Sequence, residues 1–262
     1  MYFMKSGIPN DYRVIETSDG SFTLYSESFQ EACHSPAGAK TETLLHYIQG
    51  CQVHEKLAAK NTLSILEVGF GTGLGMTTTY DSLKETRKPV FFISLEIDKR
   101  LADDFFSRED LKDLYQAKWV SQAEFGYYEG SRLNFHFKIL IGNARKILPQ
   151  FLEIMPQSWD AIYQDAFSPK RNPVLWTREW FELLRSHSKP DTILSTYSAG
   201  DAIRKSMIEA GWKVYKGEKF GAKRTSTRAR LEGETDSDIL ELLSRSPAKA
   251  IIDADVPEEL FK

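Results

Sequence analysis

The sequence predicts an α/β fold with a mostly parallel β-sheet and helices on both of its faces. Three observations support this prediction. Short apolar segments alternate with helical ones between residues 61 and 231, most of the apolar segments are continuously hydrophobic, and a glycine-rich turn follows the first of them. Strands that are buried on both faces are continuously hydrophobic, whereas strands with one solvated face alternate polar and apolar residues. The chain of 262 residues is long enough for one such domain with a small appendage.

Residues 1–60 are predicted to form the appendage, a hairpin and a helix packed on the main domain. The segment 13–25 (RVIETSDGSFTLY) places two short strand-like stretches around a Ser-Asp-Gly turn, which predicts a β-hairpin. Residues 38–60 show helical periodicity. The apolar side of this helix carries Leu44, Leu45, Ile48 and Cys51.

Residues 61–231 are predicted to form the main domain, with seven strands and helices between them. The strands are expected at 63–68, 89–97, 133–142, 159–165, 192–197, 212–215 and around 225–231. The helices are expected to follow the first five strands, ending near residues 84, 117, 155, 188 and 210. Residues 232–262 are predicted to be an acidic tail with one short helix at 239–243 and weakly ordered flanks.

Charge is unevenly distributed along the chain, although the net charge is only −3. Residues 213–230 contain seven cations and one acid, whereas residues 231–262 contain nine acids and three cations. The first segment is a candidate surface for a polyanion, and the second a candidate interaction or solubility segment. Solvated lysines beside a flexible tail remain the alternative.

Nothing in the sequence predicts secretion, a membrane span or a metal site. The first residues lack an apolar signal region, and no apolar run approaches the roughly 18 residues that cross a bilayer. The two cysteines, Cys33 and Cys51, form no CxxC pair. We therefore expect a protein of the reducing cytoplasm. The sequence does not indicate an oligomeric state.

The loops after the strands are expected to form the binding site. Ligands of open α/β sheets bind beyond the carboxyl ends of the strands, so the residues that follow Val68, Ile97, Ile141, Gln164 and Tyr197 are expected to surround one crevice.

The first of these loops carries the most informative motif, ILEVGFGTGLG. The dinucleotide fingerprint GxGxxG fails, because Leu74 or Met76 stands where its last glycine belongs. The pattern ExGxGxG resembles motif I of the class I S-adenosylmethionine-dependent methyltransferases. That resemblance implies a Rossmann-like fold and a loop that approaches the cofactor. The predicted cofactor-binding residues of this motif are Glu67, Gly69, Gly71 and Gly73.

Two further strand ends supply candidate cofactor ligands. Glu96 ends the second strand, where an acid commonly accepts hydrogen bonds from ribose hydroxyls, with Asp98 as the nearby alternative. After the third strand, Asn143 and Ala144 occupy the position of an adenine contact. Methyltransferases of this class often have an Asp there, and the amide oxygen of Asn143 can still accept a hydrogen bond.

The loop after the fourth strand carries the most specific signal, DAFSPKRNPVLW. It resembles the signature D-[AG]-F-[SA]-P-x-x-N-P-x-[LM]-W of the tRNA 5-methylaminomethyl-2-thiouridine methyltransferases. Three more stretches resemble that family: residues 18–44, the glycine loop, and residues 195–224 with their F-G-x-K-R element. The resemblance covers roughly residues 18–230. The chain carries no counterpart of the flavin-binding oxidase half found in bifunctional members.

The resemblance implies methylation of the exocyclic amine of 5-aminomethyl(-2-thio)uridine at the tRNA wobble position. The nucleophile is the neutral amine, although an untuned primary alkylamine has a pKa near 10. Asp165 is the predicted catalytic residue, which orients the amine and takes up or relays its proton. Phe167 and Pro169 are expected to form an apolar wall beside the cofactor or the base.

The expected macromolecular partner is the anticodon stem-loop of tRNA. Cations supply phosphate contacts and aromatic side chains stack on unstacked bases. The predicted substrate-binding residues are Pro169, Lys170, Arg171, Asn172, Trp176, Phe220, Lys223 and Arg224. A separate flavoenzyme is an expected supplier of the aminomethyl substrate.

Three other functions stay open at the level of sequence. An S-adenosylmethionine-dependent enzyme acting on a small amine, including an aminopropyltransferase relative, fits the modest net charge. An NAD-dependent oxidoreductase is opposed by Leu74. A tRNA-binding protein without catalysis predicts a filled crevice and no cofactor binding.

Overall fold

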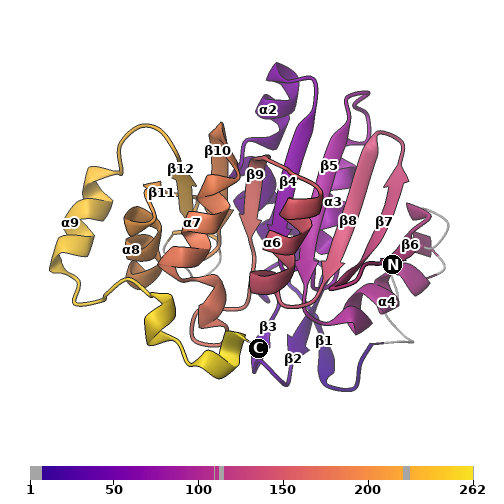
Figure 1. Ribbon diagram of the computed structural model, residues 1–262, viewed down its shortest axis with the longest axis horizontal. Helices are drawn as coiled ribbons and strands as arrows, with labels where there is room; N and C mark the ends of the chain where they lie inside the picture. The colour runs from indigo at the N-terminus through magenta and orange to yellow at the C-terminus, as the bar shows by residue number, and fades with distance from the viewer. Residues whose placement is uncertain (1–7, 109, 112–114, 221–224, 262) are drawn as a thin grey trace.

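The computed structural model describes residues 8–108, 110–111, 115–220 and 225–261. A nine-stranded sheet forms its centre, with the strand order β11-β12-β10-β9-β4-β5-β8-β7-β6 (Figure 1). The five central strands are parallel, and two antiparallel strands continue the sheet at each edge. The predicted α/β class and the parallel centre are confirmed.

All seven predicted strands are present. They are β4 (Leu63–Val68), β5 (Val90–Glu96), β8 (Phe135–Ile141), β9 (Trp159–Gln164), β10 (Ser188–Thr196), β11 (Lys213–Lys216) and β12 (Thr227–Arg230). Two strands that the sequence analysis did not predict, β6 (Lys118–Ser121) and β7 (Gly126–Arg132), extend the sheet beyond β8. They lie at an edge and contain many polar residues, so they lack the continuous hydrophobicity that identified the central strands.

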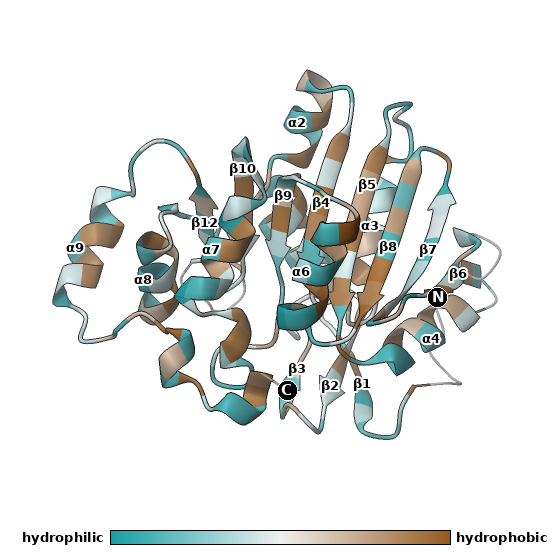
Figure 2. Cartoon of the chain, in the orientation of Figure 1, coloured by the Kyte–Doolittle hydropathy of each residue, from teal (hydrophilic) through white to brown (hydrophobic). Residues whose placement is uncertain are grey.

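Helices cover both faces of the large sheet, as expected for its continuously apolar central strands (Figure 2). One face packs against α2 (Val53–Ala59), α3 (Leu74–Leu83) and α4 (Lys99–Ser107), and the other against α6 (Ala144–Ile154), α7 (Arg178–Ser186) and α8 (Asp201–Glu209). Every residue of β4 and β9 is buried. These two strands therefore form the rigid middle of the molecule.

The N-terminal extension forms a second, small sheet with the order β1-β2-β3. Its strands are β1 (Tyr12–Glu16), β2 (Phe22–Ser26) and β3 (Glu31–Ala32), so the predicted hairpin is present with one more short strand. Figure 1 places this sheet at the end of the large sheet toward which the central strands point. The extension therefore lies where the predicted crevice opens.

The single helix predicted over residues 38–60 is instead interrupted. It consists of α1 (Ala39–Thr43), a π-helical segment η1 (Leu44–Gln49) and α2, with Gln52 at a φ of 55° before α2. The hydroxyl of Ser195 on β10 donates a hydrogen bond to the carbonyl of His46, within the π-helical turn. Sequence periodicity does not reveal a backbone carbonyl that is bonded by a distant strand.

The C-terminal residues pack against the main domain instead of forming a loose tail. Helix α9 (Ser237–Arg245) buries Ile239 and Leu243. The chain then passes α8, where Lys205 Nζ donates to the carbonyls of Ser246 and Ala248 at 3.0 and 2.7 Å. The prediction of weakly ordered flanks is therefore wrong for Ser246 and Ala248, which these hydrogen bonds hold against α8. The proposed division at residues 60 and 231 stays a prediction.

Candidate functional site

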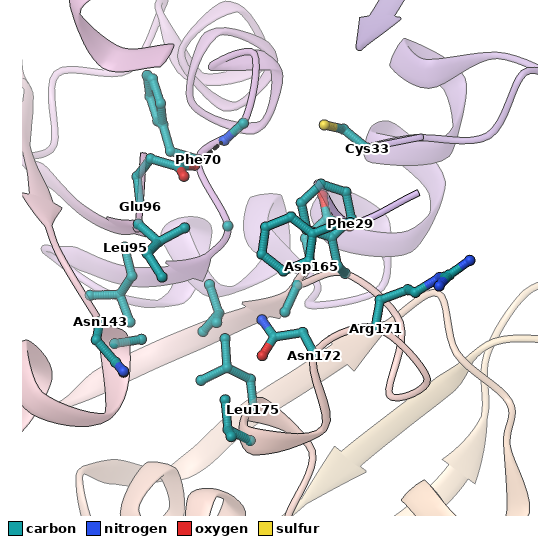
Figure 3. A pocket seen from close by; sticks show the side chains of 18 of the residues that line it. Phe29, Cys33, Phe70, Leu95, Glu96, Asn143, Asp165, Arg171, Asn172 and Leu175 are labelled. Atoms are coloured by element: carbon teal, nitrogen blue, oxygen red, sulfur yellow. Dashed lines mark hydrogen bonds between the residues drawn. The ribbon is translucent and has the colours of Figure 1, made fainter. Parts of the chain in front are cut away.

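A cavity of about 330 Å³ opens at the carboxyl ends of β4, β5, β8 and β9. That volume is typical of small-molecule sites. Its lining comes from six parts of the chain, including residues near both ends. They are Phe29, Cys33, His34, Val68–Gly71, Leu95–Ile97, Leu101, Gly142–Ala144, Asp165–Phe167, Arg171–Leu175, Glu259 and Leu260. Figure 3 shows Glu96 and Asn143 on one side of this cavity and Asp165 and Arg171 on the other.

The glycine loop forms the floor of the cavity between β4 and α3. Gly69 has a φ of 106°, and a Cβ there would lie 2.7 Å from the backbone carbonyl oxygen of Asp165. Gly71 has a φ of 52°, and a Cβ there would approach only Cys33, at 3.9 Å. Glycine is the residue that adopts such positive φ values without strain. Gly69 therefore allows the β4 and β9 loops to touch, and Gly71 leaves its face of the loop open to a ligand.

Glu96 ties the glycine loop to the end of β5. Its Oε2 accepts a hydrogen bond from the backbone N–H of Gly71 at 2.8 Å, and its Oε1 accepts one from the N–H of Asp98 at 2.9 Å. Burial raises the pKa of Glu96 to about 7. The side chain still borders the cavity, so its remaining acceptor capacity faces a ligand. Asp98, the alternative considered from sequence, caps α4 instead.

Asn143 borders the cavity but already makes two hydrogen bonds. Its Oδ1 accepts from the backbone N–H of Arg145 and caps α6, and its Nδ2 donates to the carbonyl of Phe261 at 2.9 Å. Ala144 follows it on the cavity wall. The C-terminal segment is thus held against the position that the sequence analysis assigned to adenine recognition.

The loop after β9 is held in place by hydrogen bonds along its length. Trp176 Nε1 donates to the carbonyl of Phe167 at 2.8 Å, and Gln164 Nε2 donates to the carbonyl of Leu175 at 2.8 Å. The backbone N–H of Ser168 donates to Glu31 in the N-terminal extension at 2.9 Å. Asp165, at the start of this loop, is therefore fixed relative to the glycine loop.

Not every predicted cofactor residue lines the cavity. Glu67 is buried under the glycine loop, where its Oε2 accepts from Ser94 at 2.6 Å, and burial raises its pKa well above the usual value. Gly73 caps α3, and a Cβ there would lie 2.4 Å from the ring of Phe105. These two residues support the loop from beneath. Gly69, Gly71, Glu96, Asn143, Ala144 and Phe167 all line the cavity.

Only some of the predicted substrate-binding residues line the cavity. Arg171 and Asn172 line the cavity, whereas Pro169 and the exposed Lys170 stand beside it in the same loop. Phe220 lies against His46, with ring centroids 6.0 Å apart, and does not line the cavity. Lys223 and Arg224 lie outside the described residues.

The structure contradicts the prediction that Trp176 stacks on a nucleobase. Its side chain is completely buried in the core, and it contacts the rings of Phe181 and Tyr197. A buried ring has no free face for a base. Its indole N–H instead fixes the Phe167 carbonyl, so Trp176 shapes the loop that carries Asp165.

Several cavity residues were missed because their signal is not local. Phe29 stacks on Phe167 with centroids 4.4 Å apart, and His34 faces Asp165 with 3.8 Å between Nε2 and Oδ2. Tyr47 donates to Asp165 from behind the cavity wall. The only sequence signal was the resemblance of residues 18–44 to one family's N-terminal segment.

The described residues contain no group of three or more His, Cys, Asp or Glu side chains that could hold a metal ion. Across the same ranges, every helix is too short or too polar to cross a bilayer.

Comparison with known proteins gives one consistent result. A family described as S-adenosyl-L-methionine-dependent methyltransferase matches residues 107–232. The tRNA 5-methylaminomethyl-2-thiouridine biosynthesis bifunctional protein MnmC of Leptospira interrogans is 30% identical over 226 residues, which cover 79% of this chain and 34% of that protein. MnmC of Thiobacillus denitrificans is 25% identical over 243 residues, covering 86% and 37%. The chain thus spans about a third of the length of these relatives.

A solved structure agrees with these matches. The crystal structure of MnmC2 from Aquifex aeolicus has a TM-score of 0.75 and 26% sequence identity, covering 97% of this chain and 82% of that chain. The open Gly71 face, the acid at the end of β5 and the cavity volume all fit S-adenosyl-L-methionine, the cofactor of this enzyme class. The chain is an S-adenosyl-L-methionine-dependent methyltransferase similar to the MnmC proteins.

Proposed function

We propose that this enzyme methylates the exocyclic amine of 5-aminomethyluridine, with or without a 2-thio group, at the wobble position of tRNA. One observation carries the proposal. The acid of the family's signature loop, Asp165, borders the same cavity as the glycine loop and Glu96. A methyl donor and an amine acceptor can therefore meet beside one carboxylate. The MnmC relatives support tRNA as the source of that amine.

The cofactor side of the cavity is formed by residues that can hold an adenosyl group. Glu96 is the acceptor for ribose hydroxyls, Gly71 leaves room for close approach, and Asn143 with Ala144 borders the adenine end. Phe167 adds an apolar surface that Phe29 supports by stacking. When bound, S-adenosyl-L-methionine supplies an electrophilic methyl group on a sulfonium.

We assign to Asp165 the binding and activation of the substrate amine. A primary alkylammonium in water has a pKa of roughly 10, so it must lose a proton before it can attack. A carboxylate at the cavity wall attracts the ammonium, orients it by accepting a hydrogen bond, and takes up or relays its proton. The side chain of Asp165 is only 10% exposed, which keeps water from competing for this contact.

The tRNA contacts are assigned to the rim of the cavity. Lys170 and Arg171 are exposed beside the mouth and carry charges suited to phosphates. Pro169 and Asn172 flank the entry path of the base, and we keep Phe220, Lys223 and Arg224 as further RNA contacts. In this proposal the protein acts in the cytoplasm, and a separate flavoenzyme supplies the aminomethyl group.

The deciding experiment is methyl transfer to tRNA that carries 5-aminomethyluridine, followed by mass analysis of the nucleosides. We expect a mass gain of one methyl group on that nucleoside alone. Transfer to a free small amine, with none to tRNA, would replace this proposal by the small-amine enzyme. Thermal stabilisation by S-adenosyl-L-methionine and not by NAD checks the cofactor separately.

Asp165→Asn is the matching variant. It keeps the shape of the side chain but loses the charge, so we expect turnover to be abolished and S-adenosyl-L-methionine affinity to stay close to that of the wild type. Wild-type turnover in this variant would remove Asp165 from the mechanism.

A further inference from the structure

Two side chains of the N-terminal extension meet the carboxylate of Asp165. The hydroxyl of Tyr47 donates a hydrogen bond to Oδ1 at 2.5 Å, and Nε2 of His34 lies 3.8 Å from Oδ2. Asp165 and His34 line the cavity, whereas Tyr47 does not. Tyr47 thus contacts the carboxylate from the protein interior, and His34 contacts it from the cavity wall.

The ring of His34 is anchored by the hydroxyl of Thr23. Thr23 Oγ1 accepts from the backbone N–H of His34 at 3.0 Å, and it also lies 3.0 Å from Nδ1 of the same residue. In the tautomer that has its hydrogen on Nε2, this hydroxyl donates to Nδ1. Burial lowers the pKa of His34 to about 4, so the ring is neutral and carries one hydrogen. We assign that hydrogen to Nε2. That hydrogen faces Asp165.

Tyr47 is held equally firmly. It is 1% exposed and stacks on Tyr163 of β9, with ring centroids 5.2 Å apart. It lies in the π-helical turn η1, which Ser195 holds through the carbonyl of His46. Burial and the neighbouring carboxylate raise the pKa of Tyr47 well above its usual value, so the phenol keeps its proton and remains a donor. The irregular helix therefore places one donor beside Asp165.

We propose that Tyr47 and His34 are positioning residues, which hold the Asp165 carboxylate ionised and directed so that it accepts a hydrogen bond from a primary amine in the cavity. This inference rests on the proposed function, and it extends it by assigning the N-terminal extension a direct part in amine recognition. The Tyr47 hydroxyl donates directly to Oδ1, and a donor aimed at a carboxylate favours its charged form. The His34 ring stands 3.8 Å from Oδ2, close enough to limit how the carboxylate turns. Together the two side chains fix which of the carboxylate oxygens is turned to the substrate.

Three other titratable groups also interact with Asp165. They are Cys33, just after β3, Glu67 on β4, and Tyr197, just after β10. Burial raises the pKa of each of these groups. Near neutral pH these three groups add little charge beside the carboxylate.

The test compares Tyr47→Phe, His34→Gln and His34→Leu in the tRNA methylation assay. We expect Tyr47→Phe to lower kcat on the order of tenfold to hundredfold, as small misplacements of a reacting group do. Its affinity for S-adenosyl-L-methionine and its Tm should change little, and the acid limb of its pH–rate profile should move to higher pH. Glutamine keeps an N–H donor, so His34→Gln should retain more kcat than His34→Leu.

The control is Tyr25→Phe, which removes a hydroxyl from the same extension, at a site where it bonds only the exposed side chain of Gln30. It should behave as the wild type. A Tyr47→Phe enzyme with unchanged kcat and pH profile overturns the proposal, as does equal loss in the two His34 variants. Failure of the wild type to methylate tRNA rejects the proposed function instead, and this inference with it.

Discussion

The carboxylate of Glu96 at the end of β5 accepts a hydrogen bond from the backbone N–H of Gly71 at 2.8 Å, which joins two strand ends across the cofactor cavity. The same carboxyl has a pKa raised to about 7 by burial. The ionised form is the better acceptor both for the Gly71 N–H and for the ribose hydroxyl that we propose it receives. The affinity for the cofactor is therefore coupled to pH near neutrality.

We predict that S-adenosyl-L-methionine binds more weakly as the pH falls through 7. At one unit below the pKa only about a tenth of the carboxyl is ionised, so the dissociation constant should rise by up to about tenfold between pH 8 and pH 6. Calorimetric titration at several pH values measures this. Glu96→Gln should bind weakly at all these pH values and lose the slope; a wild-type constant that is independent of pH contradicts the assignment.

We predict the opposite trend for the stability of the protein without cofactor. The folded-state pKa of Glu96 lies above its ordinary value of 4.5, so the protonated form is favoured in the folded protein. The free energy of unfolding should fall as the pH rises from about 4.5 to 7, by at most roughly 3 kcal/mol from this group. Urea unfolding measures the slope. Glu96→Gln should flatten it, while Glu129→Gln, at a partly exposed ion pair with Lys138, should leave it unchanged.

Gly69→Ala is predicted to abolish methyl transfer. The added Cβ would lie 2.7 Å from the carbonyl oxygen of Asp165, so the signature loop must shift away from the glycine loop. Gly20→Ala is the matched control, because Gly20 also has a positive φ, of 75°, but has open space around its Cβ position. Both variants should lose on the order of 1–3 kcal/mol of stability. Only Gly69→Ala should lose activity; equal activities would show that the loop contact is dispensable.

Removing residues 258–262 is predicted to weaken cofactor binding on the order of tenfold. Glu259 and Leu260 line the cavity, and the carbonyl of Phe261 accepts from Asn143. Without them the adenine end opens to water and Asn143 loses a partner. Fluorescence or calorimetric titration gives the constant. Asp238→Asn, which breaks an exposed pair with Lys216 in the same C-terminal region, should bind as the wild type does.

Trp176→Phe separates a core role from base stacking. The variant loses the hydrogen bond to the Phe167 carbonyl and part of a buried ring, so a loss of about 1–3 kcal/mol in unfolding free energy is expected. The KM for tRNA should stay near the wild-type value. Trp119→Phe changes an indole that is 42% exposed and should cost little stability. A raised KM with unchanged stability would restore the stacking role.

The parts of the fold that sequence predicted share a physical cause. β4 and β9 are buried on both faces, so their composition alone identifies them. β6 and β7 lie at an edge with mixed polarity and gave no such signal. Trp176 illustrates the converse limit, because a tryptophan that opens a helix has the same sequence signature whether it is buried or exposed.

The candidate site was predictable where its residues follow strands and not where they come from other segments. Asp165 and Glu96 stand at strand ends, and the topology of a parallel sheet brings such positions together. Tyr47 and His34 reach Asp165 through a π-helical turn and a short third strand, which depend on contacts such as Ser195 with His46. No local periodicity encodes those contacts.

The cavity is lined by residues from both ends of the described chain, Phe29 and Leu260, and these are synthesised far apart in time. A ribosome adds roughly 5–20 residues per second, so these two parts of the cavity wall emerge about ten seconds or more apart. The nascent chain can form its central strands during that interval but cannot present a closed pocket. Cofactor capture should therefore wait until residues 259 and 260 have emerged, and products that terminate before them should neither sequester the methyl donor nor gain stability from it.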